Sequence, residues 1–256
     1  MAARGHKHAS GALTLFSWFG EVAVFSGRLF KRSIRPPVEA RELLRQLDEI
    51  GTKSIPLVAL AGAAIGAVLT LHTQDTLERF GAESLIPSLI VFSMIQESGP
   101  LITALVVAGR VGSGIGAELG AMKVTEQIDA LQVSAIDPLK LLVFTRVLAL
   151  TVALPLLTLF ADACGILTGY IINRIPLALF LEEGFRYIRI EDFVPHTLRS
   201  AIFGLIIGLI SCYQGMNVRG STAEVGRATT RSVVLSMLLV IVADVILVKL
   251  IYLIFG

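Results

Sequence analysis

Residues 109–133 read GRVGSGIGAELGAMKVTEQIDALQV, a segment that changes from apolar to polar along its length. Gly112, Gly116 and Gly120 recur every four residues, so on a helix they form one bare face that another helix backbone can approach closely. Polar residues then interrupt the run, while apolar residues keep helical spacing up to Val133. The segment predicts a membrane helix with a tight packing face, followed by a short amphipathic helix over residues 123–133.

The composition is that of a protein folded in lipid. Of the 256 residues, 54% are hydrophobic and 16% are charged, and the mean hydropathy is +0.77, far from the averages of soluble domains. The pairs Gly62 with Gly66 and Gly204 with Gly208 repeat the four-residue spacing in other apolar runs. A net charge of +2 without a basic face argues against nucleic-acid binding. We therefore expect an all-α integral membrane protein with closely packed helices.

Five apolar stretches are long enough to cross a hydrocarbon core of about 30 Å at about 1.5 Å per residue. They cover approximately residues 54–73, 85–109, 147–172, 198–216 and 231–255. Lys and Arg concentrate before the first stretch, between the second and third, and between the fourth and fifth, so the N-terminus is expected in the cytoplasm and the C-terminus on the opposite side. The outer loops hold fewer cations, namely Arg79, Arg174, Arg186, Arg189 and Arg199.

Residues 1–53 are expected at the cytoplasmic face. Over residues 11–30, aromatic and aliphatic side chains surround Glu21 and lead into a basic cluster, which is typical of a helix lying in the headgroup region. A short tilted span is the alternative. Pro36 and Pro37 end this helix, and an amphipathic helix follows them. On the outer side, residues 173–197 are too polar to span and too apolar for a free loop, so short surface helices are expected there.

The sequence predicts no catalytic residue, metal site or cofactor site on this chain. The glycines of residues 109–133 satisfy neither phosphate-binding glycine template, and no strand precedes them. The four histidines lack the spacing of metal ligands, and Cys164 and Cys212 lie in apolar runs. Any ATP, with its Mg²⁺, must therefore be bound by a partner chain.

Three acidic residues lie at membrane depth, where a charge costs about 2.5–3.5 kcal/mol on insertion scales. Glu97 comes just before a Gly-Pro pair, which should kink the second span and free a backbone carbonyl. Glu97 is either a functional group or a hydrogen-bonded packing element. Asp162 and Asp244 are expected to be structural, with Lys249 as a loose partner of Asp244.

Two longer motifs carry a family resemblance. Residues 96–139, QESGPLITALVVAGRVGSGIGAELGAMKVTEQIDALQVSAIDPL, and residues 226–234, GRATTRSVV, are similar to the signature of the MlaE/YrbE family, the permease subunits of MCE-type ABC lipid transporters. The resemblance spans residues 10–256. It implies a homodimer with a permease domain over residues 54–256, cytoplasmic ABC ATPase subunits, and a ring of MCE-domain protein on the periplasmic side. Such a complex moves phospholipid between the bacterial inner membrane and a periplasmic carrier, in systems that maintain outer-membrane lipid asymmetry.

The resemblance also implies roles for individual residues. Residues 123–133 become a coupling helix that contacts the ATPase through Lys123, Glu126, Gln127, Asp129 and Leu131. A lipid cavity at the dimer interface would be lined by Glu97, Gln96, Met94, Ile90, Leu69, Leu77 and Phe80. Gln96 departs from the family pattern, since many relatives carry a basic residue there. The glycine face then packs the helix whose polar end the ATPase pushes.

Two other classes of function are alternatives to a lipid permease. A membrane-embedded enzyme would need convergent reactive groups, whereas Glu97, Asp162 and Asp244 lie on different spans without a His or Cys companion. An ion-coupled secondary transporter of a hydrophobic substrate would use these acids as proton sites and need no motor. The coupling-helix motif favours the ATP-driven class, and ATP-independent flux in vesicles would favour the secondary transporter.

Overall fold

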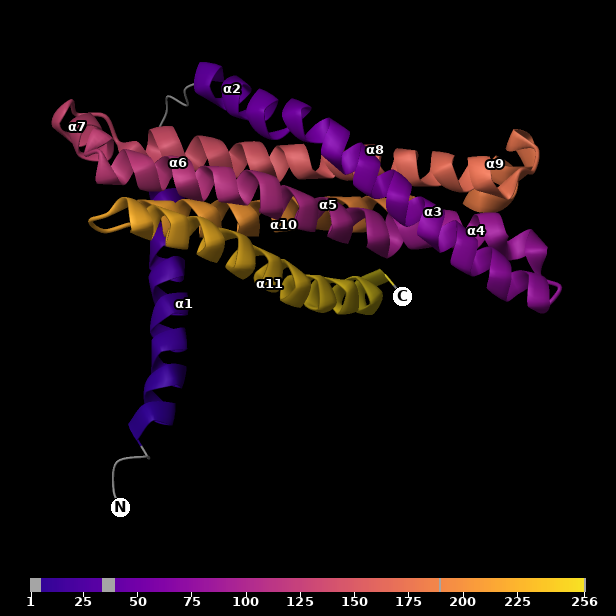
Figure 1. Ribbon diagram of the computed structural model, residues 1–256. Coiled ribbons are helices and arrows are strands. Elements are labelled where there is room, and N and C mark those ends of the chain that lie inside the picture. The colour runs from indigo at the N-terminus through magenta and orange to yellow at the C-terminus, as the bar shows by residue number, and fades with distance from the viewer. Residues whose placement is uncertain (1–5, 34–39, 189, 256) are drawn as a thin grey trace.

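The computed structural model describes residues 6–33, 40–188 and 190–255, and no strand occurs in these ranges (Figure 1). The helices before the glycine-rich segment are α1 (His6–Ser33), α2 (Ala40–Ile50), α3 (Ile55–Arg79), α4 (Ile86–Ser93) and α5 (Gly99–Val107). The helices from there to the end are α6 (Ser113–Val124), α7 (Gln127–Val133), α8 (Thr145–Asn173), α9 (Leu177–Phe185), α10 (Ile190–Met216) and α11 (Thr222–Phe255). Pro36, Pro37 and Arg189, which figured in the sequence predictions, lie outside the described residues.

Five helical runs are long and apolar enough to cross a membrane, as predicted. They are Ala40–Arg79, Glu83–Val124, Leu139–Asn173, Phe193–Met216 and Thr222–Ile254. Each run is longer than the stretch predicted for it. In the second run, π-helical turns over Met94–Ser98 and Ala108–Gly112 join α4, α5 and α6 into one run through the glycine face.

The second run continues past residue 109 because its charged residues find partners inside the bundle. Arg110 Nη1 donates hydrogen bonds to Ser54 Oγ at 2.7 Å and to the Glu49 carbonyl oxygen at 3.2 Å. Further along, the Glu118 carboxylate forms an ion pair with Arg146 at 2.8 Å. A charged side chain that is paired in this way can be accommodated within a long helix, so the helix continues past the apolar stretch of residues 85–109.

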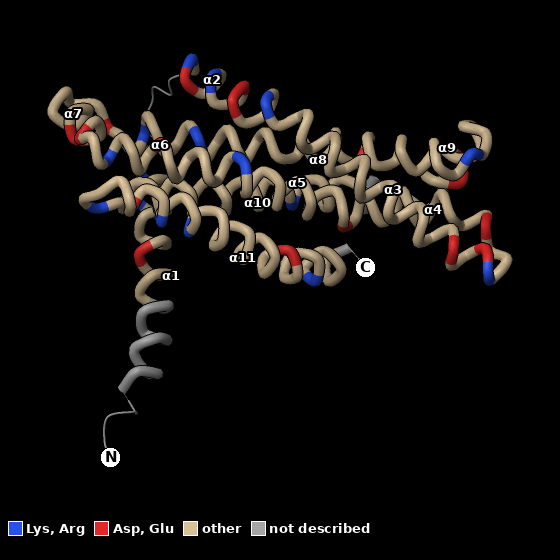
Figure 2. The backbone as a smooth tube through the Cα atoms, in the orientation of Figure 1, with Lys and Arg blue, Asp and Glu red and all other residues tan. Residues whose placement is uncertain are grey.

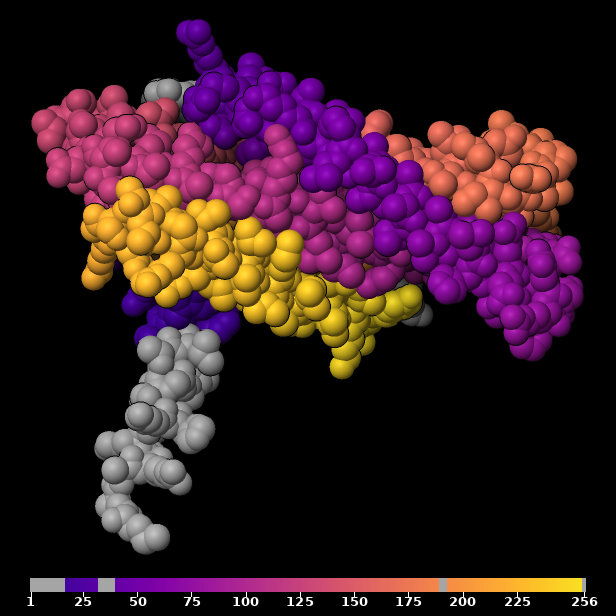
Figure 3. Space-filling model, viewed as in Figure 1, coloured from indigo at the N-terminus to yellow at the C-terminus, as the bar shows by residue number. Residues whose placement is uncertain are grey.

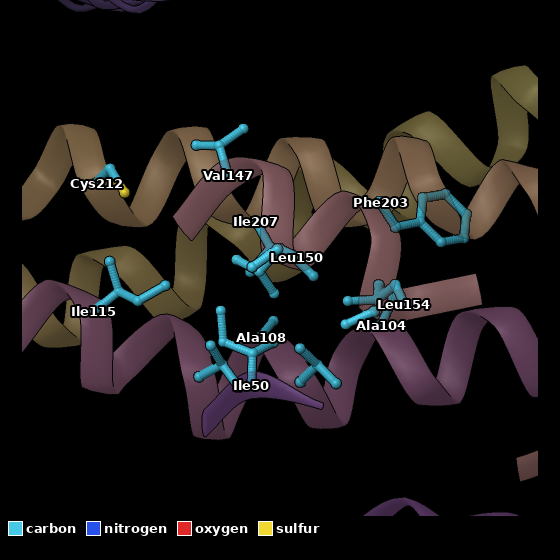
Figure 4. Packing of buried hydrophobic residues seen from close by; sticks show 14 of the residues in the cluster. Ile50, Ala104, Ala108, Ile115, Val147, Leu150, Leu154, Phe203, Ile207 and Cys212 are labelled. Atoms are coloured by element: carbon cyan, nitrogen blue, oxygen red, sulfur yellow. The ribbon is translucent and has the colours of Figure 1, made fainter. Parts of the chain in front are cut away.

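Helix α8 lies at the centre of the bundle, packed along α3 and α10 and also against α2 and α5. Figure 4 shows Leu150 and Leu154 of α8 among Ala108, Phe203 and Ile207 from neighbouring helices. All five side chains are completely buried. Because lipid tails are as apolar as these side chains, close van der Waals packing and not exclusion of water holds such helices together.

Pairs of glycines set the closest approaches to α8. A Cβ atom on Gly62 or Gly66 of α3 would overlap the α8 backbone at Ala161 or Gly165. On the other side of α8, a Cβ on Gly204 would overlap the carbonyl group of Leu150. These contacts need a residue without a side chain, because the helix backbones themselves touch.

The glycine face of α6 packs against the other two long helices. A Cβ on Gly112 would lie 3.1 Å from Ser211 Oγ of α10, and one on Gly116 would lie 2.5 Å from Ser232 Oγ of α11. At Gly120 the neighbours are Val218 and Val225, which flank the loop between α10 and α11. The face is thus a seam that fastens α6 to α10 and α11.

Helix α1 projects away from the bundle, across the direction of the long helices, near the end that carries α7 (Figure 1). Tyr213 of α10 donates a hydrogen bond from its hydroxyl group to Glu21 Oε2 at 2.5 Å, and the rings of Trp18 and Phe25 pack edge-on against Tyr213. This orientation suits a helix that lies along the membrane surface.

Helix α11 lies on the outside of the bundle, and Figure 3 shows it at the surface along its length. In its most apolar window only 17% of residues are buried within the chain, against 61% in that of the run containing α8. At the opposite end from α7, the segment predicted to form short surface helices contains α9, and α10 already begins at Ile190.

Candidate functional site

A polar site inside the bundle forms where a proline interrupts the second run. Pro100 has no backbone N–H, so the carbonyl oxygen of Gln96, four residues earlier, lacks its usual helical donor. Arg199 Nη2 of α10 donates a hydrogen bond to this oxygen at 2.5 Å. The freed carbonyl predicted from the Gly-Pro pair is therefore used, and its partner is a buried arginine.

Two acidic residues balance the charge of Arg199. Its side chain is 1% exposed and forms ion pairs at 3.3 Å with Glu97 and with Asp244 of α11. A third acid, Asp162 of α8, is buried under the same turn, where a Cβ on Gly99 would overlap its Oδ1 atom. Neither oxygen of Asp162 has a hydrogen-bond partner among the described residues. We call Glu97, Asp162, Arg199 and Asp244 the polar centre.

The position of Arg199 corrects the sequence prediction, which placed it in an outer loop. Arg199 lies in the interior of α10 and points toward the polar centre. Asp244 is accordingly paired with Arg199 and not with Lys249, which is exposed. A signal was available, because Arg199, Phe203 and Ile207 are four residues apart on one helix face and the latter two are typical core residues.

The residues predicted to line a lipid cavity fall into three groups. Glu97 keeps 51% of its side chain exposed, and Gln96 accepts a hydrogen bond from the Tyr252 hydroxyl group at 3.3 Å. Ile90 and Met94 are fully buried, and they fill the space against Gly169 and Gly165 of α8. In this structure they reach no surface, so they pack helices and do not form a cavity wall.

The remaining three residues that were predicted to line a lipid cavity lie along α3 and just after it. Leu69 and Leu77 are partly buried on α3, and Phe80, the residue that follows the helix, is 80% exposed. Among the described residues, none of the hollows that we describe contains these three side chains together with Glu97.

The second candidate site is the polar tip of the bundle, which α7 forms (Figures 1 and 2). Ile128 is completely buried and anchors the helix, and Leu131 packs partly against the main core. Glu126, Gln127 and Asp129 are exposed. An apolar anchor below and polar groups above give a surface that a soluble partner can contact without unfolding the tip.

The amphipathic helix was predicted to begin at Lys123, but it begins at Gln127. Glu126 has a φ of 59° in the left-handed region, which separates α6 from α7. Lys123 lies in the last turn of α6, and its Nζ atom forms an ion pair with Asp129 of α7 at 2.8 Å. Lys123 therefore braces the angle between two helices, and Asp129 is engaged with it. No glycine at position 126 signalled this break.

A bundle of five candidate spanning helices with an exposed polar helix at one end and a polar centre within is the architecture of a multi-pass membrane permease. The chain belongs to the MlaE permease family, since residues 43–250 match the family model described as Permease MlaE.

The chain is similar to several relatives along nearly its whole length. A probable ABC transporter permease protein from Rickettsia conorii is 39% identical over 91% of this chain and 92% of the relative. A probable ABC transporter permease protein from Synechocystis is 32% identical over 95% of this chain and 94% of the relative. The chloroplastic protein TRIGALACTOSYLDIACYLGLYCEROL 1 of Arabidopsis thaliana is 33% identical over 91% of this chain and 68% of the relative.

Proposed function

We propose that this chain is the transmembrane subunit of an ATP-driven transporter that moves phospholipid between the inner membrane and a periplasmic MCE-domain carrier. In this proposal the chain acts as a homodimer, with its N-terminus and α7 in the cytoplasm and its C-terminus in the periplasm. ATP and Mg²⁺ are bound by partner ABC ATPase subunits, and the chain itself carries out no reaction.

The observation that carries the proposal is α7. It presents exposed polar residues at the end of the bundle, while the Lys123–Asp129 ion pair and the buried Ile128 join it firmly to α6 and the core. A push on α7 is therefore transmitted to the second spanning run, which contains the polar centre. The relatives named as ABC transporter permeases support an ATPase as the partner.

Lipid as the substrate is supported by the half-exposed Glu97 beside apolar surface, and by the plant relative, whose name is that of a glycolipid. A second copy of the chain is supported by the outer half of α11, whose large apolar side chains are exposed. They include Val245, Ile246, Leu250 and Leu253. An exposed apolar face of this kind is met either by lipid or by another protein surface.

Purification from the native membrane in mild detergent tests the whole proposal. Proteins that co-purify are identified, and bound lipid is extracted for mass spectrometry. An ATPase and an MCE-domain protein arriving together with phospholipid are expected. A stable chain that arrives alone and without lipid would contradict the proposal.

Charge reversal tests the docking surface itself. Glu126→Lys together with Asp129→Lys should release the ATPase or uncouple ATP hydrolysis from lipid movement, because both acids lie on the exposed side of α7. The measurement is ATP-driven lipid transfer in proteoliposomes. Asp75→Lys with Glu78→Lys is the matched control, since these acids are exposed at the opposite end and Asp75 is likewise paired, with Arg79 at 2.9 Å. Normal coupled transfer by the α7 variant would refute the assignment.

An ion-coupled transporter remains the alternative that one observation favours. The buried Asp162 carboxyl group has no hydrogen-bond partner among the described residues, and an acid at membrane depth is a candidate proton-binding site. Lipid flux in vesicles that follows a proton gradient, needs no ATP and is lost in Asp162→Asn would establish this alternative.

A further inference from the structure

An apolar groove lies between α1, α10 and α11, near the same end of the bundle as α7. Its volume is about 680 Å³, within the range of pockets that hold small amphiphilic ligands. Trp18 and Phe19 of α1 form one wall, and the first half of α11 forms the other with Val234, Leu235, Leu238 and Leu239. None of the residues that line the groove belongs to the polar centre.

A smaller hollow of about 400 Å³ adjoins this groove at Thr230 and Arg231, which line both. Its other lining residues are Ala223, Gly226 and Arg227. No atom lies within 4 Å of the position that a Cβ on Gly226 would take, so this hollow is open beside the helix. Arg231 thus lies between the apolar side chains of the larger hollow and Arg227 of the smaller one, and within the described ranges Glu224 is the one carboxylate that lines either of them.

The smaller hollow is lined by two arginines, and only one of them forms an ion pair among the described residues. Arg227 is paired with Glu224 at 2.6 Å, whereas no carboxylate forms an ion pair with Arg231 among the described residues. Glu21, the acid of α1 closest in sequence to Trp18 and Phe19, accepts the hydrogen bond of Tyr213. Arg231 is nine residues, or about 13 Å, into α11 and stands at the start of the apolar stretch 231–255, where a spanning helix meets the headgroup region.

The geometry points to a binding site for an anionic glycerophospholipid of the leaflet that surrounds the α7 end, with an acyl chain in the apolar groove and the phosphate group against Arg231. An arginine with an apolar stem and a free guanidinium suits this position, since it spans the boundary between acyl chain and headgroup. The site gives the segment GRATTRSVV a role beyond starting α11. It requires neither ATP nor a partner chain, so its test is independent of the proposed transport.

Trp18 makes the site measurable, because it is the only tryptophan of the chain and lines the groove. The purified full chain is placed in lipid nanodiscs with increasing amounts of phosphatidylglycerol or phosphatidylcholine, brominated on their acyl chains. Bromine quenches tryptophan fluorescence on contact. Phosphatidylglycerol should quench Trp18 at a mole fraction about fivefold lower than phosphatidylcholine, the preference that one basic residue near an anionic lipid provides.

Variants at one position assign the preference to Arg231. Arg231→Gln should abolish the fivefold difference, while Arg231→Lys should keep most of it, because lysine retains the charge. Arg219→Gln is the matched control, since Arg219 is exposed at the same end and lines neither hollow. Circular dichroism and gel filtration check that each variant is folded.

Three outcomes would overturn the proposal. Equal quenching by the two lipids in the unaltered protein would show ordinary contact with bulk lipid. A preference that persists in Arg231→Gln would place the anionic site elsewhere. Weak quenching by either lipid, together with disulfide cross-linking of two chains through Leu238→Cys in a background without Cys164 and Cys212, would show that a second copy covers the groove.

Discussion

The free carbonyl oxygen of Gln96 explains how an arginine is accommodated inside this bundle. Arg199 donates to that oxygen, and the carboxylates of Glu97 and Asp244 balance its charge. A buried charge with both a backbone acceptor and counter-charges is far less costly than an isolated one. Arg199 is therefore the shared partner, and removing it would leave Glu97 and Asp244 without their counter-charge.

Replacing Arg199 by leucine should destabilise the protein by about 3–5 kcal/mol, because Asp244 would remain buried without its counter-charge. The measurement is the thermal unfolding midpoint of the purified protein in detergent. The double variant Arg199→Leu, Asp244→Leu should recover part of the loss, since it removes both charges. Arg79→Leu, at an exposed ion pair, should change stability by less than about 0.5 kcal/mol. Equal stability of Arg199→Leu and Arg79→Leu would show that the buried pair is not structural.

Glu97 differs from its partners because half of its side chain is exposed. Glu97→Ala should alter the amount or kind of lipid that co-purifies, or slow transport, without dissociating the complex, since the proposed lipid contact is lost while Asp244 still pairs with Arg199. Lipid mass spectrometry of the purified complex measures this change. Glu78→Ala, an exposed acid near the end of α3, serves as the control. Unchanged lipid and transport in Glu97→Ala would assign Glu97 to helix packing alone.

At the scale of the elements, the glycines of α3 determine how closely it approaches α8. Gly66→Ala should destabilise the protein by about 1–3 kcal/mol, because the new methyl group would overlap the Gly165 backbone and push two helices apart. Gly114→Ala is a matched test on α6, where nothing lies within 4 Å of the new atom, and the better helix propensity of alanine should stabilise by up to about 1 kcal/mol. Unfolding in detergent compares the two, and similar effects would mean that close backbone contact is not what Gly66 provides.

The sequence predicts the existence of the long helices better than their ends or neighbours. Apolar length identifies five candidate spans, and four-residue glycine spacing identifies packing faces. Helix ends were misplaced where a charge is satisfied by a distant residue, as Glu118 is by Arg146, because that partner is known only from the fold. The break at Glu126 was missed for a local reason, since a left-handed glutamate has no sequence signal comparable to glycine.

The polar centre, too, could be predicted from the sequence only in part. Glu97 and the carbonyl freed by Pro100 were predicted, because both follow from local sequence. Their link to Arg199 joins residues 102 and 103 positions apart, and Arg199 in turn pairs with Asp244 on another helix, so no local pattern reveals these contacts. Arg199 was predicted to be an outer-loop cation because charged side chains are expected to be exposed. This expectation holds for most arginines and fails for those that are paired with carboxylates inside the fold.

At the scale of the whole molecule, exposed charge is distributed unevenly between the two ends (Figure 2). Around α7, cations such as Arg28, Lys31 and Arg219 are exposed. At the opposite end, Arg79 and Arg186 pair with Asp75 and Glu183 of their own helices or turns. Arg146 and Arg199 are buried and carry no information about orientation. When these two arginines are left out, the uneven distribution of cations between the two ends remains. The positive-inside rule therefore still supports a cytoplasmic α7.

Cysteine labelling tests this orientation directly. In a background without Cys164 and Cys212, a single cysteine replaces Val133 at the end of α7, which is 90% exposed, or Phe80 after α3, which is 80% exposed. In spheroplasts, a maleimide that cannot cross the membrane should label Phe80→Cys, because α3 carries the chain from the α7 end to the other face. Val133→Cys should react only after lysis. The reverse pattern would invert the proposed topology and place α7 out of reach of a cytoplasmic ATPase. Labelling of both positions before lysis would mean that α3 does not cross the membrane.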